Sequence, residues 1–508
     1  MRIVTTPLAP SVPLPPLSRS GGVAESLLAA LVAAPGVEAI RSRLRDPAVV
    51  VVTTGQQPGL FTGPLYTLYK ALSASAIAQE LEHRWGRPVV PVFWAAGDDH
   101  DYAEARWASW LDGHGELVTA TLPDRAPDAP LTAMARLPLP AEVTGLIEQL
   151  EGAVPASPQR EQTLAWLGRH YAPGRTLGAA YAGALAELFA PLGIACFDST
   201  HPSAKAAMVP VLMEALGRAA ELDRALADQA SALAAAGRPI TVPVGDGATL
   251  VFLEDGAGRD RLVLDQGSFV ARRSGTRATL AQLETIAAAM PERLSPNVLL
   301  RPVTESALLP TVAYVAGPGE LAYFAQCTPL YDRLGVPAQL PVPRWSGIIV
   351  EPRVDRVLEK FGATLADLLE PGTALEGRVI RSHLPAALIA AADRLRQAMD
   401  HEYHTILDGA IQIDPTLERP VGAALHHAQT GLSDIEKKIQ AHLKKREATE
   451  LSQIGRARSA VAPGGKPQER VLTGAAWLAR YGPTLLDQVR AEAAGWYAGA
   501  LAARAGAS

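Results

Sequence analysis

Residues 49–70 read VVVVTTGQQPGLFTGPLYTLYK, and this stretch decides the fold of the chain. Its four valines predict a buried strand, because β-branched side chains suit a pleated sheet and a strand covered on both faces is apolar throughout. Gly59, Gly63 and Pro64 predict a turn into a helix, since proline fits the first helical turn. A second apolar run, Val89–Trp94, completes a β-α-β unit. The pattern therefore predicts a parallel sheet in an α/β protein.

The same order of strand, turn and helix returns later in the chain. The apolar runs Ile194–Asp198 and Val312–Val315 are each followed by a turn and by a helical pattern. Helices are also predicted over Gly22–Ala33 and over Glu161–Ala190, from apolar residues at helical spacing. Short strands separated by glycines are predicted between Ile240 and Leu264. These elements extend the predicted Rossmann-like core to about residue 354.

After the core, the sequence changes to heptad spacing. The apolar residues seven positions apart are Leu388 and Leu395, then Met399, Ile406 and Ile413, and on the far side Leu425, Leu432 and Ile439, as well as Ala428 and Ile435. A proline-containing link at residues 414–420 separates the two sets, which predicts an antiparallel coiled-coil hairpin within residues 355–463. The heptads can be satisfied within one chain or between two chains. Residues 464–508 are predicted to return to the core.

Composition excludes several classes of protein. The chain has 508 residues with a net charge of −5, which gives no reason to expect nucleic acid or an anionic membrane surface as a partner. No run reaches the roughly 18 apolar residues that a spanning helix needs. Its two cysteines, Cys196 and Cys327, form no disulfide framework and indicate a reducing cytoplasm. Both lie in apolar segments and are expected to be inert core residues.

Polar side chains gather where the first two strands end, the place where open α/β sheets bind ligands. After the first strand come Gln56 and Gln57, which suit hydroxyl or carboxylate groups, and a helix start that offers N–H groups to an anion. The loop is not a P-loop, because it has no Gly-Lys-Ser/Thr. A tight turn that merely connects strand and helix would also explain its glycines.

The second strand ends in Asp98-Asp99-His100-Asp101. Adjacent carboxylates raise one another's pKa, and a histidine among them can act as a general base that a carboxylate orients. An acidic helix N-cap is the structural alternative, and a metal held by Asp98, His100 and Asp101 is a third reading. The four residues are the candidate catalytic group.

Further candidates lie in other turns. A partly buried arginine such as Arg301 usually pairs with a carboxylate of protein or substrate. The candidate substrate-binding residues are Gln56, Gln57, Gly59, Thr62, Gly63, Pro64, Tyr66, Lys70, Gly97, His201, Asn297, Arg301, Gly319, Glu320 and Tyr323. The glycine-hinged loop at Gly464-Gly465 suits a phosphate or carboxylate clamp, and the candidate nucleotide-binding residues there are Lys466, Glu469 and Arg470.

Five segments together resemble the bacillithiol biosynthesis cysteine-adding enzyme family, in matching order and spacing over almost the whole chain. They are Thr54–Lys70, Pro91–Asp101, Ser295–Val303, Leu309–Gln326 and Lys466–Tyr481. The family's turn usually reads Gly-Glu-Asp-His-Asp, so Asp98 stands where a longer carboxylate is usual. The resemblance implies a core similar to class I nucleotidyltransferases, with an inserted coiled coil that supports a homodimer.

The resemblance also implies the reaction, in which the carboxylate of cysteine is joined to the amine of glucosaminyl-malate. A free carboxylate is a poor electrophile, so we expect activation by ATP with Mg²⁺. His100 would remove the amine proton, with Asp99 or Asp101 orienting it. Lys466 and Arg470 would neutralise phosphate or the malate carboxylates.

Two other functions fit the residues. The core pattern also suits a nucleotidyltransferase or nucleotide-sugar enzyme, which would release pyrophosphate with a sugar phosphate in place of cysteine. A nucleotide-binding coiled-coil scaffold is the non-enzymatic alternative, and the polar residues at the strand ends argue against it.

Overall fold

The computed structural model describes residues 1–17, 19 and 21–502, which include a five-stranded parallel sheet at the centre of the fold. In their order across the sheet, the strands are β13 (Leu340–Pro343), β12 (Thr311–Ala316), β2 (Val50–Gln56), β3 (Val89–Ala95) and β6 (Ala195–Asp198). Every residue of β3 is buried, as the apolar run predicts. The predicted parallel α/β sheet is confirmed.

The chain folds into two compact units. The core unit comprises residues 3–113, 117–349 and the chain from Pro467 onward, and the helical unit comprises residues 1–2, 114–116 and 350–466. Among the described residues, no helix combines the length and the apolar character that crossing a membrane requires.

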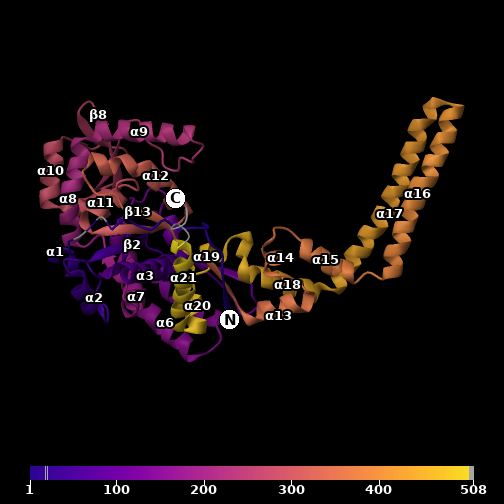
Figure 1. The fold of residues 1–508 in the computed structure, drawn as a ribbon, viewed down its shortest axis with the longest axis horizontal. Coiled ribbons are helices and arrows are strands. Elements are labelled where there is room, and N and C mark those ends of the chain that lie inside the picture. The colour runs from indigo at the N-terminus through magenta and orange to yellow at the C-terminus, as the bar shows by residue number, and fades with distance from the viewer. Residues whose placement is uncertain (18, 20, 503–508) are drawn as a thin grey trace. The chain divides into compact units, whose positions relative to one another are not determined.

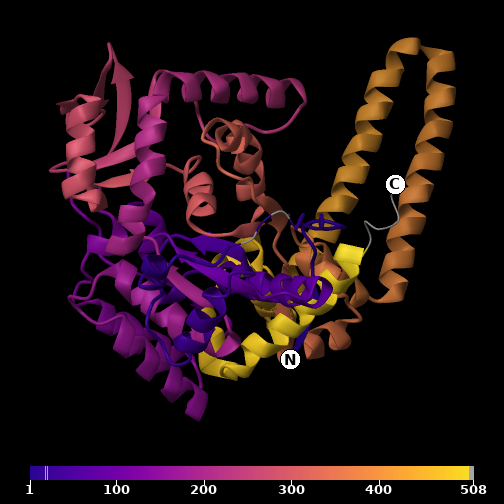
Figure 2. The ribbon, with the colours of Figure 1, turned by 60° about the vertical axis from the view of Figure 1, so that its left-hand side comes forward.

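Helices cover both faces of the central sheet. Helix α3 (Tyr66–Trp85) packs on β2 and β3, and α21 (Thr484–Ala502) packs on α3. Figures 1 and 2 show α3 and β2 side by side in the core unit. Phe93 lies against Phe189 of α7 (Leu177–Phe189), with ring centroids 5.4 Å apart. This double cover explains why the strands carry no polar alternation.

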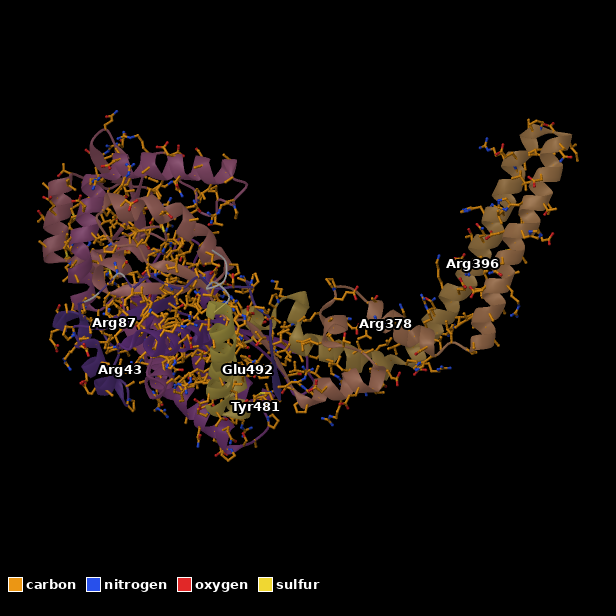
Figure 3. All side chains as sticks on the ribbon, in the orientation of Figure 1. Arg43, Arg87, Arg378, Arg396, Tyr481 and Glu492 are labelled. Carbon is orange, nitrogen blue, oxygen red and sulfur yellow. The ribbon has the colours of Figure 1, made fainter. Side chains whose placement is uncertain are left out.

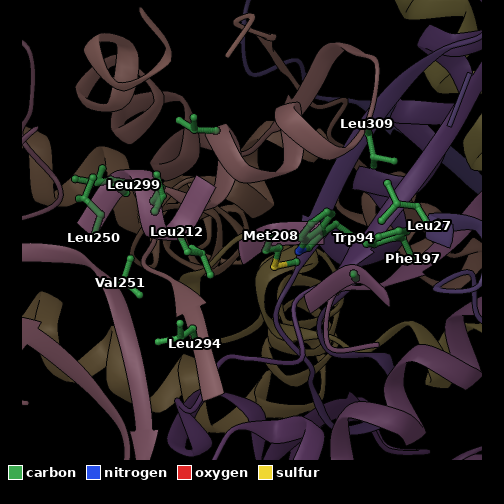
Figure 4. Close-up of a cluster of buried hydrophobic side chains, with 14 of the residues drawn as sticks. Leu27, Trp94, Phe197, Met208, Leu212, Leu250, Val251, Leu294, Leu299 and Leu309 are labelled. Carbon is green, nitrogen blue, oxygen red and sulfur yellow. The ribbon is translucent and has the colours of Figure 1, made fainter. Parts of the chain in front are cut away.

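The other face forms an extensive apolar cluster. Trp94 of β3 stacks on Phe197 of β6, with ring centroids 5.0 Å apart, and Met208 of α8 (Pro202–Gly217) belongs to the same cluster (Figure 4). The cluster continues through Val251 and Leu294 to a second sheet. The strands of that antiparallel sheet, in order, are β10 (Arg277–Ala278), β9 (Ser268–Ala271), β8 (Gly258–Asp265), β7 (Ala248–Asp255) and β11 (Leu294–Pro296).

The remaining elements of the core unit surround these sheets. The remaining strands are β4 (Trp107–Leu111) and β5 (Leu117–Thr121), which form a hairpin, and β1 (Arg2–Thr5) and β14 (Gly347–Val350), which pair with each other. The helices are α1 (Glu25–Leu28), α2 (Val37–Leu44), α4 (Tyr102–Ala105), α5 (Val143–Ala153), α6 (Pro158–His170), α9 (Ala219–Ala235), α10 (Leu280–Ala289), α11 (Arg301–Leu308), α12 (Pro318–Arg333), α19 (Gln468–Val471) and α20 (Gly474–Tyr481).

Two helix predictions are wrong in extent. The helix predicted over Gly22–Ala33 is only the four residues of α1, because the backbone beyond it pairs with β6: Val32 N–H donates to Cys196 O at 2.9 Å. The helix predicted over Glu161–Ala190 is two helices, α6 and α7. Gly174 between them has φ +81°, which interrupts the helical backbone.

The helical unit contains the predicted antiparallel hairpin. Helices α16 (Ala386–Ile413) and α17 (Glu418–Arg446) lie side by side, and the 3-10 turn Pro415–Leu417 links them (Figure 1). Many side chains of the hairpin stand out from it, and Arg396 of α16 pairs with Glu436 of α17 at 2.9 Å (Figure 3). The other helices of this unit are α13 (Pro352–Phe361), α14 (Leu365–Leu369), α15 (Ala374–Ser382) and α18 (Ala448–Val461).

Candidate active site

A cavity of about 660 Å³ opens at the carboxyl ends of the central strands, within the core unit. Gln56 ends β2, Asp98 follows β3 and Gly317 follows β12, and all three line the cavity. The charged and amide side chains of the lining are Gln56, Gln57, Lys70, Asp98, Asp99, Glu104, Arg259, Arg261, Asn297, Arg301, Glu320, Arg344 and Arg470. The cavity therefore lies where an open α/β sheet binds its ligands.

Lys70 is a buried cation on one wall of this cavity. Its ammonium group donates to Gly55 O at 2.8 Å and to Gln56 Oε1 at 3.0 Å, and it pairs with Glu320 Oε2 at 2.6 Å. Burial lowers the pKa of Lys70, and the Glu320 carboxylate opposes that shift. Lys70 thus fixes the side chain of Gln56, so the end of β2 joins the start of α12.

Arg301 is held in a similar way. Its guanidinium pairs with Glu305 Oε2 at 2.8 Å and donates to the Tyr323 hydroxyl at 3.1 Å. The guanidinium carbon lies 4.9 Å from the ring centre of Tyr314. The prediction that Arg301 pairs with a carboxylate is confirmed, and the partner is a protein group.

In the turn after β3, the carboxylates have separate partners. Asp98 Oδ1 accepts from Lys205 at 2.9 Å, while Asp99 Oδ1 accepts from the backbone N–H of Asp101 at 2.8 Å. Asp101 caps the short helix α4 by accepting from Glu104 N–H at 3.2 Å. Among the residues that the structure describes, Asp98, His100 and Asp101 do not form a group that could surround a metal ion.

His100 contacts a residue that the sequence analysis did not single out. Its Nδ1 lies 3.1 Å from Arg259 Nη1. A guanidinium can only donate, so Nδ1 accepts and the proton of the neutral ring is on Nε2. Burial lowers the pKa of His100, and Arg259 and Arg273 lower it further, against the opposing charges of Asp99 and Asp101.

Comparison with known proteins agrees with this arrangement. Two family models match, one described as "Bacillithiol biosynthesis BshC, N-terminal Rossmann-like domain" over residues 29–345 and one as "Bacillithiol biosynthesis BshC, C-terminal coiled-coil domain" over residues 347–494. The chain belongs to the bacillithiol biosynthesis BshC family. The recognised resemblance is therefore confirmed.

Relatives within the BshC family carry the name "Putative cysteine ligase BshC". The protein from Salinibacter ruber is 33% identical over 463 residues, which are 88% of this chain and 81% of that protein. The one from Prosthecochloris aestuarii is 29% identical over 93% of this chain and 84% of its own length. The one from Chlorobaculum tepidum is 30% identical, with 88% and 81% covered.

The structure brings most of the predicted BshC site residues to one cavity. Those that line it are Gln56, Gln57, Tyr66, Lys70, Asp98, Asp99, Asn297, Arg301, Gly319, Glu320, Tyr323 and Arg470. Asn297 also uses its side-chain oxygen to accept from the N–H groups of Leu299 and Leu300, at 3.0 and 2.9 Å, so it shapes the turn before α11.

Other predicted residues support the turns around the cavity. The Gly59–Pro64 turn is buried against Tyr171, whose hydroxyl donates to Gly59 O at 2.9 Å and accepts from Thr62 N–H at 2.8 Å. Thr62 has φ +72° and Gly63 has φ +71°, so the turn is strained at a non-glycine residue. Pro64 bridges to Thr473. These residues hold the start of α3 in place.

Gly97 and His201 also lie beside the site and not in its lining. A Cβ at Gly97 would approach Thr200 Cγ2 to 2.9 Å, so the turn after β3 requires glycine there. His201 caps α8, because its Nδ1 accepts from the N–H of Ser203 at 3.2 Å.

The predicted clamp at residues 466–470 separates into three roles. Arg470 lines the cavity and is exposed. Glu469 is buried, pairs with both terminal nitrogens of Arg344 and accepts from Ser346 Oγ at 2.9 Å. Lys466 belongs to the helical unit. Glu469 thus orients an arginine of the cavity.

Five charged residues of the site were not predicted from the sequence, namely Glu104, Lys205, Arg259, Arg261 and Arg344. Lys205 lies in α8, and nothing in the sequence distinguishes it from any other lysine of a helix. Arg259 and Arg261 lie two residues apart on β8, a spacing typical of the polar face of an exposed strand. Two arginines at i and i+2 on one strand face were the available signal.

Proposed function

We propose that this chain joins the carboxylate of cysteine to the amine of glucosaminyl-malate to form bacillithiol. The observation that carries the proposal is that the Asp98–Asp101 turn and the Gln56–Lys70 segment, both part of the family resemblance, meet at one cavity at the carboxyl ends of the sheet. A volume of about 660 Å³ is in the range of small-molecule sites.

Amide formation requires an activated carboxylate. We propose that ATP supplies the activation, through an acyl phosphate with release of ADP or an acyl adenylate with release of pyrophosphate. The sugar amine then attacks the acyl carbon, the phosphate or AMP leaves, and the amine loses one proton. Atoms and charge balance on either route.

The charges of the cavity fit a nucleotide. Arg470 is exposed at the cavity and has no ion-pair partner among the residues that the structure describes, so it is available to phosphate oxygens. Glu104 lines the same cavity with carboxylate oxygens, the ligands that Mg²⁺ prefers. When bound, the ion would neutralise phosphate charge.

The proton of the amine needs an acceptor. His100 Nδ1 already accepts from Arg259, which leaves an N–H at Nε2. Asp99 lines the cavity and has one carboxylate oxygen engaged by the backbone of Asp101. We therefore assign proton acceptance to Asp99. The alternative is the predicted role of His100 as the base, and the kinetics of His100 variants distinguish the two assignments.

Product formation tests the proposal. Purified protein is incubated with cysteine and glucosaminyl-malate, with and without Mg-ATP, and the thiol products are measured by mass spectrometry. Bacillithiol formed only with ATP is the expected result. Bacillithiol formed without ATP would refute nucleotide activation, and no bacillithiol in either tube would refute the assigned reaction.

We further propose a cytoplasmic homodimer that pairs through the coiled coil. No residue of α16 is buried, and apolar heptad residues stay exposed within the hairpin: Leu395 by 49%, Ile406 by 54% and Ile435 by 57%. An apolar groove of the helical unit runs along Ile435, Ile439 and Leu443. A second copy that covers these side chains would remove apolar surface from water.

A further inference from the structure

Four buried or largely buried cations of the core unit share one property. Each is neutralised by a carboxylate of the protein, and the pairs are Lys70 with Glu320, Lys205 with Asp98, Arg301 with Glu305 and Arg344 with Glu469. This is the usual arrangement, because a charge without a partner is costly to remove from water.

Arg259 departs from this arrangement. It is 9% exposed and lines the cavity, yet among the described residues no carboxylate oxygen lies within ion-pair distance of it. Its guanidinium donates to neutral acceptors: Ser295 Oγ at 2.8 Å, Pro296 O at 2.7 Å and His100 Nδ1 at 3.1 Å. A guanidinium has five N–H groups, so two remain, one on each terminal nitrogen.

A second arginine lies beside it with the same property. Arg259 and Arg261 are two residues apart on β8, so their side chains share one face of the strand. Their guanidinium carbons lie 4.1 and 5.8 Å from the ring centre of Phe252, and all three residues line the cavity. Arg261 also has no ion-pair partner in the described part of the chain. This wall of the cavity therefore carries two guanidinium groups that no carboxylate of the described residues contacts, and the charges of Asp98, Asp99 and Glu254 act on Arg259 only from beyond ion-pair distance.

We propose that Arg259 and Arg261 bind the two carboxylates of the malyl group of the acceptor, and that His100 is the positioning residue of Arg259. The inference rests on the proposed function and adds the position of the acceptor within the cavity. Two adjacent guanidinium groups suit a dicarboxylate, because each can donate two parallel hydrogen bonds to a carboxylate. The neutral partners of Arg259 orient it without using its charge, which leaves that charge for the ligand.

The kinetic test compares Arg261→Gln and Arg259→Lys with a matched control. Arg277→Gln is the control, because Arg277 lies in the same sheet but is exposed and pairs with Asp265 at 2.7 Å. We expect the two site variants to raise KM for glucosaminyl-malate about 10- to 100-fold, the usual loss for a charged hydrogen bond. KM for cysteine should stay within about twofold. The control should match the wild type in both.

A substrate comparison identifies the group that is bound. Wild-type protein should prefer glucosaminyl-malate over a glucosaminide that lacks carboxylates, and both site variants should lose most of this preference. An unchanged KM for glucosaminyl-malate would overturn the inference. An increase confined to KM for ATP would also overturn it, because the anion bound there would then be phosphate.

Binding measured without turnover separates this inference from the proposed function. Calorimetry with glucosaminyl-malate should show binding to wild type and Arg277→Gln, and at least tenfold weaker binding to Arg261→Gln. If no bacillithiol forms but this pattern holds, the reaction is wrong and the carboxylate site stands. If bacillithiol forms and all three proteins bind equally, the reaction stands and the carboxylate site is refuted.

The role of His100 has its own readout. The side-chain oxygen of Asn can occupy the position of Nδ1 and accept from Arg259, whereas Ala cannot. His100→Ala should therefore raise KM for glucosaminyl-malate with kcat largely kept, and His100→Asn should restore KM. A loss of kcat of more than about 100-fold in both variants, with KM unchanged, would show a general base instead.

Discussion

The ammonium group of Lys205 lies 2.9 Å from Asp98 Oδ1, and Lys205 is only 1% exposed. It also donates to Leu294 O at 2.6 Å, so this one lysine ties the turn after β3 to β11 of the second sheet. Asp98 belongs to the predicted catalytic group. Its carboxylate is already engaged, which gives it a structural role at the edge of the cavity.

Removing the charge of Asp98 should destabilise the protein. Asp98→Asn leaves the Lys205 ammonium buried without its carboxylate, and we expect a loss of about 3 kcal/mol in the free energy of unfolding. Urea denaturation measures it. The double variant Asp98→Asn with Lys205→Met removes both charges and should recover most of the loss. Equal stability of wild type and the single variant would contradict the pair's role.

Stability should fall in mild acid because of His100. Its pKa is lowered by burial and by Arg259 and Arg273, although Asp99 and Asp101 oppose the shift. The unfolded chain therefore binds the proton first, at a pKa of about 6.5. The stability that the neutral ring contributes is complete above that pH and is lost as pH falls toward the folded pKa.

Urea denaturation between pH 7.5 and 5.5 measures this loss. His100→Asn, which cannot titrate there, should lose less stability over the same range. His170 also has a pKa lowered by burial, but it is present in both proteins and cancels in the comparison. An identical loss in wild type and variant would show that His100 is not the titrating group.

Patterns confined to one segment predict the fold and part of the site. The valines of β2 and the turn of Asp98–Asp101 are local signals, and they correctly indicate a strand and a part of the cavity edge. Arg259 gives only a weak local signal, the second arginine two residues further on, because its importance lies in the carboxylate that it lacks. The prediction of a helix over Gly22–Ala33 is too long for a similar reason. The backbone after α1 pairs with β6, which lies more than 150 residues further along the chain.

Neither thiol of the protein should react in the folded state. Cys196 and Cys327 are 3% and 0% exposed, and burial raises the pKa of both, that of Cys327 to about 12. Reactive cysteines need the thiolate. A disulfide exchange reagent should titrate no thiol in native protein and two after denaturation in urea. A thiol that reacts without denaturant would contradict the assignment of both as core residues.

Nucleotide contact should depend on Arg470. Arg470→Gln removes an exposed cation from the cavity, so we expect KM for ATP to rise about tenfold, with KM for glucosaminyl-malate unchanged. Initial rates at varied ATP measure this rise. Unchanged KM for ATP would remove Arg470 from the nucleotide site.

The coiled coil should control the oligomeric state. Ile435 and Ile406 are exposed by 57% and 54% at heptad positions, and a lysine at either would meet an apolar partner surface in a dimer. Light scattering should therefore give a dimer for the wild type and a monomer for the double variant Ile406→Lys with Ile435→Lys.

Lys437→Gln is the control, since Lys437 is an exposed residue of α17 that pairs within its own helix, at 3.5 Å from Asp434. Because both isoleucines are exposed in the single chain, the double lysine variant should keep the helical content of the wild type by circular dichroism. A wild type that is monomeric at every concentration would show that the hairpin satisfies its heptads alone.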